Sequence, residues 1–152
     1  MKNKKLYLTQ LEHKLAPFEL AKQSATPAIG WVKTIRKSLG MSLEQLGKKL
    51  SVSKQSVLHL EKREASGSIT ISALKDAAHA LDMELVYGFV PKDGSIMNLV
   101  EEKARKLATE IVMRTSHNMQ LEDQAVTYQR LNKAIEERTQ EIMHQLPKSL
   151  WD

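Results

Sequence analysis

The chain has 152 residues, a net charge of +5 and no cysteine, which excludes disulfides, thiolate metal sites and thiol nucleophiles. A hydrophobic content of 41% is enough for a core, and the length allows one domain with an appendage or two small domains. Residues 1–63 hold 13 Lys and Arg against 4 Asp and Glu, so this half suits phosphate binding, whereas the acidic remainder does not.

The first predicted elements are a weak helix and a connector. Residues 4–15 place Leu8, Leu11 and Leu15 on one helical face, and the leader as a whole spans residues 1–26. Its lysines are not followed by a long apolar run, so we expect no signal peptide, and no run of 18 apolar residues predicts a membrane span. The expectation is a soluble, cytoplasmic protein without a membrane partner.

Residues 27–82 have the pattern of a small helical bundle. Pro27, preceded by a threonine as N-cap, predicts the first turn of a helix that ends at Gly40. After the polar loop at 65–68, Thr70 is the expected N-cap of a further helix through Leu81. Short helices joined by short loops are what a compact DNA-binding bundle requires.

Between those helices lies a predicted helix-turn-helix. Ser42, with Gln45 three residues later, and Ser53 each open a short amphipathic helix. The second helix has Val57 and Leu60 on its apolar face. Side chains able to donate to or contact base edges point outward from it, namely Lys54, Gln55, Leu58, His59 and Lys62. The alternative is an ordinary polar helix face, but the motif coincides with the basic half of the chain.

A charged pair is predicted inside this bundle. Arg36, on the first helix, and Glu61, on the second helix of the motif, are placed to pair across the bundle. We interpret this pair as structural, because it would close the first helix onto the recognition helix.

Residues 83–91 predict one short β-strand. One face of this strand holds Leu85, Tyr87 and Phe89, and the other holds Val86 and Val90, so both faces are apolar. No second strand pattern occurs in the chain, and a lone strand cannot satisfy its backbone. The favoured partner is the same strand of another copy, which predicts a homodimer; the alternative is an extended segment packed on its own helices.

Residues 92–152 predict a C-terminal helical hairpin. Ser95 opens one long helix, residues 115–120 read as a hinge, and a second helix runs over 121–146. The second helix carries an apolar stripe at Leu121, Ala125, Tyr128, Leu131, Ile135 and Ile142. The stripe either receives a partner protein or packs back on the bundle or across a dimer, and these two readings remain open.

No catalytic or metal pattern is found in the sequence. The five histidines are scattered, and Glu141-x-x-His144 occurs once where a di-iron bundle needs two copies. Walker, GxGxxG and nucleophile-elbow motifs are missing. We therefore expect no enzyme, no cofactor and no metal.

Residues 28–90 resemble the Xre and lambda-repressor type of helix-turn-helix. Within that superfamily the chain resembles the family called mobile mystery protein A, and five segments carry the resemblance: 30–36 (GWVKTIR), 41–56 (MSLEQLGKKLSVSKQS), 68–70 (SIT), 80–87 (ALDMELVY) and 100–105 (VEEKAR). The resemblance covers essentially the whole chain. It implies an all-α, lambda-repressor-like bundle and a regulator or antitoxin encoded beside a Fic-domain protein on a mobile element.

The resemblance also implies roles for single residues. Base reading falls on Lys54, Gln55 and His59, with Ser56 and Leu58 as secondary candidates. Phosphate contacts are implied for Ser42, Ser53, Lys62, Ser66, Gly67, Ser68 and Thr70, and the pair of Arg36 and Glu61 matches the buried ion pair of the superfamily.

Two residues depart from the superfamily pattern. Leu43 stands where many relatives have a phosphate-binding Gln, and Ser51 replaces the usual turn Gly, so that turn must be strained or adjusted. The Ser/Thr-x-x-x-Glu-Gly/Asn motif of known Fic inhibitors is missing, so the residues do not support direct inhibition of a Fic active site.

The sequence therefore predicts a homodimeric, sequence-specific repressor that binds a palindromic site in double-stranded DNA, with a Fic-domain protein as a second partner. The alternative is a protein-interaction module that restrains a Fic-type protein through its C-terminal helices.

Overall fold

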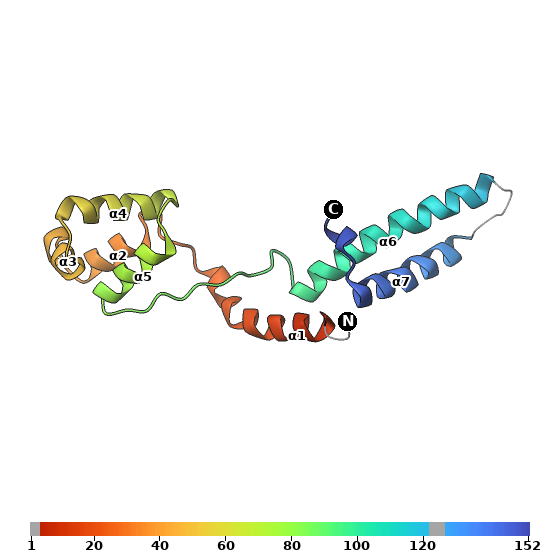
Figure 1. Cartoon of the computed structure of the whole chain (residues 1–152), viewed down its shortest axis with the longest axis horizontal. Helices are drawn as coiled ribbons and strands as arrows, with labels where there is room; N and C mark the ends of the chain where they lie inside the picture. Colours follow the sequence, from red (N-terminus) through yellow and green to blue (C-terminus); the bar gives the residue numbers. More distant parts are fainter. Residues whose placement is uncertain (1–3, 122–126) are drawn as a thin grey trace. The chain divides into compact units, whose positions relative to one another are not determined.

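The computed structural model describes residues 4–121 and 127–152, and these residues form an all-helical protein (Figure 1). Its α-helices are α1 (Lys4–Leu15), α2 (Trp31–Ser38), α3 (Leu43–Leu50), α4 (Lys54–Ser66), α5 (Ile71–Ala80), α6 (Ile96–Leu121) and α7 (Tyr128–Gln145). Short 3-10 helices are η1 (Ala16–Phe18), η2 (Leu20–Gln23) and η3 (Lys148–Trp151). None of the helices in the described ranges combines the length and the apolar character that a membrane crossing requires.

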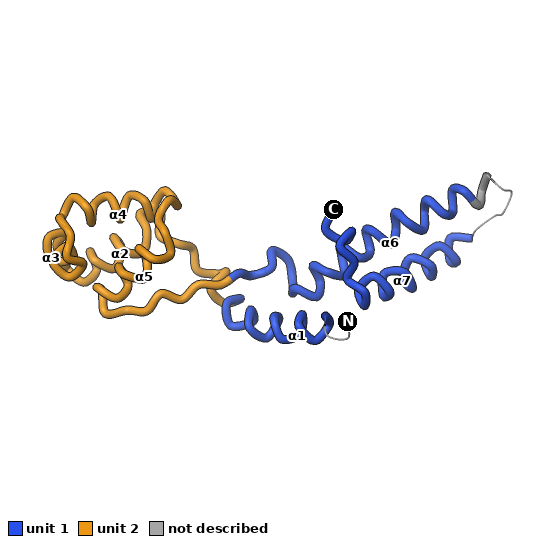
Figure 2. Tube along the Cα trace, viewed as in Figure 1, with its two compact units in different colours: residues 1–19, 89–152 blue, residues 20–88 orange. Residues whose placement is uncertain are grey.

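The chain divides into two compact units (Figure 2). One unit is continuous, residues 20–88, and contains α2 to α5. The other combines residues 1–19 with residues 89–152 and contains α1, α6 and α7. We call them the central unit and the terminal unit.

The core of the central unit is small and aliphatic, as the composition predicts. Each of its four α-helices or their end residues contributes to one buried cluster, formed by Val32, Leu46, Val57, Leu60, Ala77 and Leu81. The predicted apolar face of α4, formed by Val57 and Leu60, is thereby confirmed. Leu46, Val57 and Ala77 are fully inaccessible to solvent, so the helices are fixed against one another by close packing.

The start of α2 differs from the prediction. Pro27 forms a turn, with the Gly30 N–H donating to its carbonyl at 2.9 Å, and the helix begins only at Trp31. The predicted N-cap threonine therefore does not cap the helix. Its place is taken by Glu64 of α4, whose carboxylate accepts hydrogen bonds from the N–H groups of Trp31 at 2.7 Å and Val32 at 2.9 Å. A carboxylate from a distant helix thus satisfies the first turn of α2.

The terminal unit is built on the predicted helical hairpin. Its buried cluster lies between α6, α7 and η3, at Val100, Ala104, Ala108, Ile142 and Leu150. The leader helix α1 also belongs here, since Leu8 packs against this cluster. Lys4 adds a polar tie, because its Nζ donates to the carbonyls of Gln145 at 2.8 Å and Leu146 at 2.9 Å. The last carbonyls of α7 are thereby satisfied by a cation, which the helix dipole favours there.

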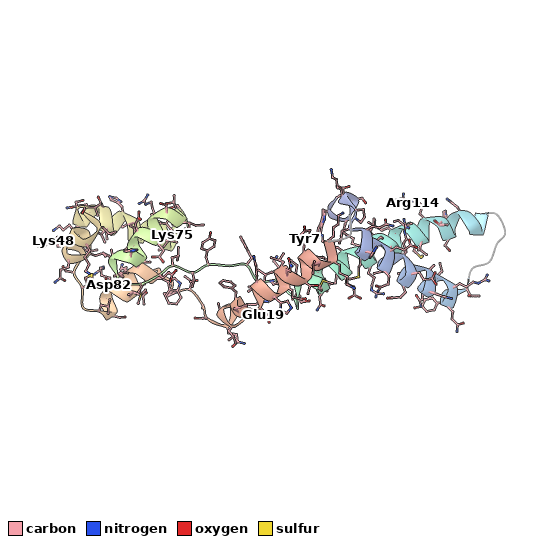
Figure 3. The ribbon with its side chains drawn as sticks, turned by 60° about the horizontal axis from the view of Figure 1, so that its bottom comes forward. Tyr7, Glu19, Lys48, Lys75, Asp82 and Arg114 are labelled. Carbon is pink, nitrogen blue, oxygen red and sulfur yellow. The ribbon has the colours of Figure 1, made fainter. Side chains whose placement is uncertain are left out.

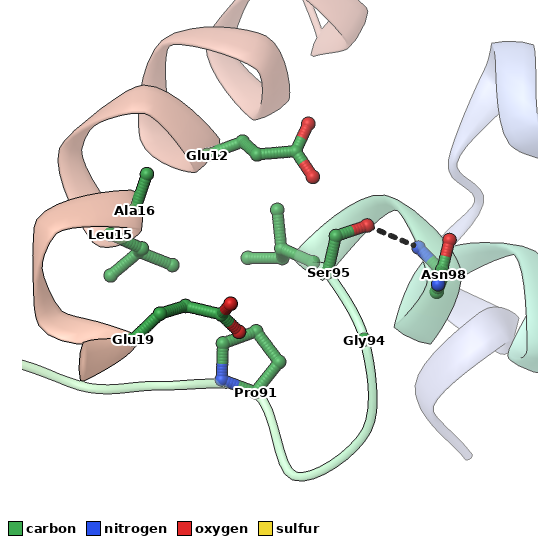
Figure 4. Close-up of a pocket in the computed structure, with 9 residues that line it drawn as sticks. Glu12, Leu15, Ala16, Glu19, Pro91, Gly94, Ser95 and Asn98 are labelled. Carbon is green, nitrogen blue, oxygen red and sulfur yellow. Dashed lines mark hydrogen bonds between the residues drawn. The ribbon is translucent and has the colours of Figure 1, made fainter. Parts of the chain in front are cut away.

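The predicted boundaries of the hairpin are partly wrong. Ser95 is confirmed as the start of α6, since its hydroxyl accepts from the Asn98 N–H at 3.2 Å (Figure 4). The predicted hinge at 115–120 is instead continuous helix, in which the Thr115 hydroxyl donates to the Ile111 carbonyl. Thr and Ser are tolerated inside a helix when they bond back in this way. Of the predicted stripe, the side chains of Leu121 and Ala125 lie outside the described residues.

The short strand predicted at 83–91 is not formed in the single chain. No strand occurs among residues 4–121 and 127–152, and no backbone hydrogen bond joins residues 84–90 to another described segment. The segment is an extended connection on which Val86 and Phe89 are 73% and 82% exposed. The physical reason is the one noted for the sequence: a strand needs a neighbouring strand, and the described residues supply none.

Candidate nucleic-acid interface

Helix α3 begins with a complete capping box. The Ser42 hydroxyl accepts from the Gln45 N–H at 3.1 Å, and the Gln45 side chain accepts from the Ser42 N–H at 2.7 Å. Both interactions follow from the sequence pattern, and they fix the direction in which α3 leaves the preceding loop.

The turn between α3 and α4 is tight. Gly47 is buried, and a Cβ added to it would lie 2.7 Å from the carbonyl oxygen of Val52, so only glycine fits there. The Val52 N–H donates to the Gly47 carbonyl at 2.9 Å. Ser51 adopts the left-handed conformation with φ 57° and ψ 38°, which a glycine would adopt at lower cost. This is the adjusted turn that the serine at that position predicts.

Helix α4 has one buried side and one exposed side. Val57, Leu60 and Glu61 are buried at 0%, 8% and 2% exposure. The candidate base-reading residues on the other side are Lys54, Gln55, Ser56 and His59, all exposed, as is Lys62. Leu58 is only half-exposed, so it offers less surface than its predicted outward position implies.

The ion pair predicted inside the bundle is present and buried. Arg36 Nε lies 2.5 Å from Glu61 Oε1, and its Nη2 lies 3.2 Å from Oε2. The third arm of the fork is also used, since Nη1 donates to the Met41 carbonyl at 2.9 Å. The pair therefore fixes α2 and the loop before α3 against α4, which presents the exposed side chains.

Three helices of the central unit begin with a hydroxyl N-cap. Ser42, Ser53 and Thr70 each accept from the backbone N–H three residues later, at 3.1 Å in every case. Because the cap uses the oxygen as an acceptor, the hydroxyls of Ser42 and Thr70 retain a hydrogen with which they can donate, whereas the Ser53 hydroxyl also lies 3.0 Å from the Ser56 hydroxyl. Helix N-termini attract anions, so these three positions have the chemistry expected of phosphate contacts.

The loop before α5 completes this set of polar groups. Gly67 ends α4 in the left-handed conformation with φ 77°, and the hydroxyls of Ser66 and Ser68 lie 2.9 Å apart. All three residues are exposed. Hydroxyl and backbone N–H donors on an exposed loop are suited to phosphate oxygens.

The surface around these groups is basic. Residues 31–70 contain eight Lys and Arg and three acidic residues. Exposed lysines of the unit, Lys48 on α3 and Lys75 on α5 among them, extend from the surface (Figure 3). Lys54 is 3.9 Å from Glu44 of α3, and both side chains are exposed. Glu44 and Glu64 had no predicted role; an acidic residue in the first turn of a helix is the signal that would have marked Glu44.

A comparison with known protein families finds a match to the part of the chain that forms this site. Residues 32–87 match the helix-turn-helix family model. They form a helix-turn-helix domain of the Xre/Cro/C1 type, a DNA-binding domain typical of non-enzymatic transcriptional regulators. The match covers about a third of the chain and names no narrower family. Comparisons with curated proteins and with solved structures gave no match.

The terminal unit holds a cavity of about 420 Å³ beside the start of α6. Figure 4 shows the carboxylates of Glu12 and Glu19 near Pro91 and Ser95 at this cavity. None of the residues predicted to have a function lines it. In the described part of the chain, no group of three or more His, Asp or Glu side chains is placed to hold a metal ion.

Proposed function

We propose that the protein is a sequence-specific transcriptional repressor in which α4 enters the major groove. The observation that carries this proposal is the exposed row Lys54, Gln55 and His59, held by a buried core inside a domain that matches the helix-turn-helix family. Lys donates to guanine O6 and N7, Gln can bond adenine bidentately, and His can donate to a purine acceptor. The N-cap hydroxyls and the loop at 66–70 contact phosphates on either side.

The proposed binding form is a homodimer on a palindromic operator. Two copies pair through residues 83–90, where Leu85, Val86, Tyr87 and Phe89 supply the apolar contacts. The pairing is supported by the exposed apolar side chains and by the backbone of residues 84–90, which forms no hydrogen bond with another described segment. Two recognition helices would then read half-sites one helical turn apart.

Selection from a randomised duplex library tests the proposed activity directly. The purified protein is expected to enrich one palindromic sequence, and a titration should show tighter binding to it than to a scrambled duplex. The selected site is then compared with the DNA upstream of the protein's own gene. Enrichment of no sequence, with equal binding to all duplexes, would contradict the proposal.

The proposed biological setting is an operon that the protein represses itself. The resemblance of segments 30–36, 41–56 and 80–87 to mobile mystery protein A supports a regulator or antitoxin encoded beside a Fic-domain protein. Such a repressor would act inside the cell, on its own promoter. A reporter fused to that promoter should be silenced by the wild-type chain and released by Gln55→Ala.

A second function is proposed for the terminal unit, which lies outside the matched residues 32–87. On α7, Tyr128 is 77% exposed, and on α6, Met113 is 50% exposed. Exposed apolar side chains on a helical hairpin favour a protein partner, here the Fic-type product of the neighbouring gene. Co-expression with that product tests it: Tyr128→Arg should abolish co-purification while leaving DNA binding intact, and unchanged co-purification would remove this role.

A further inference from the structure

Glu44 is the acidic residue of the helix-turn-helix region whose charge stays exposed: it lies in the first turn of α3, and its only ion-pair partner among the described residues is the exposed Lys54. Residues 31–70 contain only two other acidic residues, Glu61 and Glu64. Glu61 is buried against Arg36, and Glu64 accepts hydrogen bonds from the first turn of α2. Their charges are thus compensated within the domain, whereas the Glu44 side chain is 69% exposed.

The position of Glu44 puts this charge beside the recognition helix. It is the second residue of α3, two residues after the Ser42 cap, and its Oε1 lies 3.9 Å from Nζ of Lys54. Lys54 is the first residue of α4, 55% exposed, and it is the first of the proposed base-reading residues. Glu44 therefore lies between a proposed phosphate anchor and a proposed base reader.

A carboxylate at this place weakens binding to any DNA. Phosphates approach the N-termini of α3 and α4, and a like charge there repels them. A protein selected only for affinity would have a neutral or basic residue at this position. The dipole of α3 favours a carboxylate in its first turn, and the ion pair with Lys54 gives the same carboxylate a second effect.

That effect is on Lys54. An unpaired lysine on a flexible stem can donate to any phosphate oxygen within reach, and the N-terminal end of a helix dipole disfavours a cation. The Glu44 carboxylate, 3.9 Å from Lys54 Nζ, can offset the dipole and draw the lysine toward α3. A base acceptor in the correct position can then receive the lysine, while a backbone phosphate must compete with the carboxylate.

We propose that Glu44 is a specificity-determining residue: it positions Lys54 for a base edge and lowers affinity for DNA without the matching base. This inference rests on the proposed DNA-binding function and names a residue beyond the base-reading set. It acts by positioning Lys54 and by repelling phosphate, and the two effects can be separated by substitution.

Two variants of Glu44 separate them. Glu44→Gln removes the charge, whereas Glu44→Asp keeps the charge but shortens the side chain by one methylene and withdraws it from Lys54. Asp76→Asn, which removes one charge from an exposed position of α5, is the matched control. Each protein is titrated at several salt concentrations against the selected duplex and a scrambled duplex, after circular dichroism has shown the wild-type helix content.

We expect Glu44→Gln to bind the scrambled duplex about threefold to tenfold more tightly, with a smaller gain on the selected duplex. Its discrimination ratio therefore falls. Glu44→Asp keeps the repulsion of phosphates but releases Lys54, so it should gain less on the scrambled duplex than Glu44→Gln, and its discrimination ratio should also fall because Lys54 is no longer positioned. Asp76→Asn should leave the ratio unchanged.

The double variant Glu44→Asp with Lys54→Ala tests whether the effect passes through Lys54. Its discrimination ratio should equal that of Lys54→Ala alone, and a further loss would show that Glu44 does not act through the lysine. If the wild type discriminates but both Glu44 variants retain its full ratio, the inference is overturned while the proposed function stands. If the wild type itself does not discriminate, the proposed function fails first.

Discussion

At the scale of single residues, the outward row of α4 gives the sharpest prediction. Lys54→Ala, Gln55→Ala and His59→Ala should each cost about 1–3 kcal/mol at the selected duplex and little at a scrambled duplex, because base contacts are made only at the matching site. Titration of both duplexes measures the two effects. Lys62→Ala is the comparison, since loss of a phosphate contact should weaken binding to both duplexes alike. If Lys54→Ala, Gln55→Ala and His59→Ala also lose as much affinity for the scrambled duplex as for the selected one, these residues contact phosphates instead of bases.

The buried ion pair gives a prediction about stability. Glu61→Ala leaves the Arg36 guanidinium buried without its carboxylate, so it should lower the free energy of unfolding by about 3–5 kcal/mol. Urea denaturation followed by circular dichroism measures this. The double variant Arg36→Met with Glu61→Leu removes both charges and should cost much less than the single change. If the double variant is the less stable of the two, unpaired burial is not the cause.

Residues that act on their own neighbours were predictable from the sequence, and residues that act at a distance were not. The Ser42, Ser53, Thr70 and Ser95 caps each involve a backbone group three residues away, so the local pattern contains them. Glu64 caps α2 from 33 residues away. No local pattern predicts that interaction, and this is why the predicted start of α2 was wrong.

At the scale of elements, the turn between α3 and α4 contrasts a required glycine with a replaceable serine. Gly47→Ala places a Cβ 2.7 Å from a backbone carbonyl, which cannot move without opening the turn. It should cost about 1–3 kcal/mol of stability. Ser51→Gly removes the conformational cost of a non-glycine residue in the left-handed region and should preserve or raise the stability of the protein. Urea denaturation measures the free energy of unfolding of both variants. A Gly47→Ala protein as stable as the wild type would show that α3 and α4 can separate at no cost.

The contact between α6 and α7 predicts a pH dependence. Hydrogen bonds from Gln140 and then from Arg105, together with the charge of Arg105, lower the pKa of Glu136 below its ordinary value of 4.5. A lowered pKa in the folded state means that this contribution to stability is present above pH 4.5 and is lost as the pH falls through the folded value. Glu136→Gln should therefore make the melting temperature less sensitive to pH in the acidic range.

Thermal melts of the wild type and Glu136→Gln between about pH 6 and pH 3 check this dependence. Glu102→Gln removes the same charge from an exposed position of α6 and controls for net charge. Parallel pH profiles for the wild type and Glu136→Gln would show that the contact with Arg105 makes no contribution.

Periodicity identified the helices but not their partners. The leucines of 4–15 predicted an amphipathic helix, and the structure packs α1 against α6 and α7 of the terminal unit. An apolar face shows that a helix is covered without showing by what. The polar run at 115–120 had the composition of a loop, but packing continues the helix through it, with Ser116 only 5% exposed.

At the scale of the whole molecule, the architecture combines a central unit that matches a known DNA-binding domain with a terminal unit that has its own core. The length allowed one domain with an appendage or two small domains, and the change of charge marked the basic half as the one suited to phosphate binding. The sequence did not predict that the first nineteen residues belong with the last sixty-four. Long-range assembly of this kind depends on which surfaces fit, and helix pattern does not encode it locally.

The oligomeric state gives the last prediction. In residues 83–90, Val86, Tyr87 and Phe89 are exposed at 73%, 59% and 82%, and no described segment pairs with their backbone. We expect the wild type to be a dimer in sedimentation, since burying these side chains between two copies removes apolar surface from water and pairs the free backbone groups.

The substitution Val86→Pro tests this pairing. It removes a backbone N–H donor from the proposed strand and should weaken dimerisation and operator binding together. Val86→Thr, which keeps the backbone N–H and the side-chain volume at the same position, is the comparison. A stable wild-type monomer, or a Val86→Pro protein that dimerises and binds its operator normally, would contradict the proposed pairing.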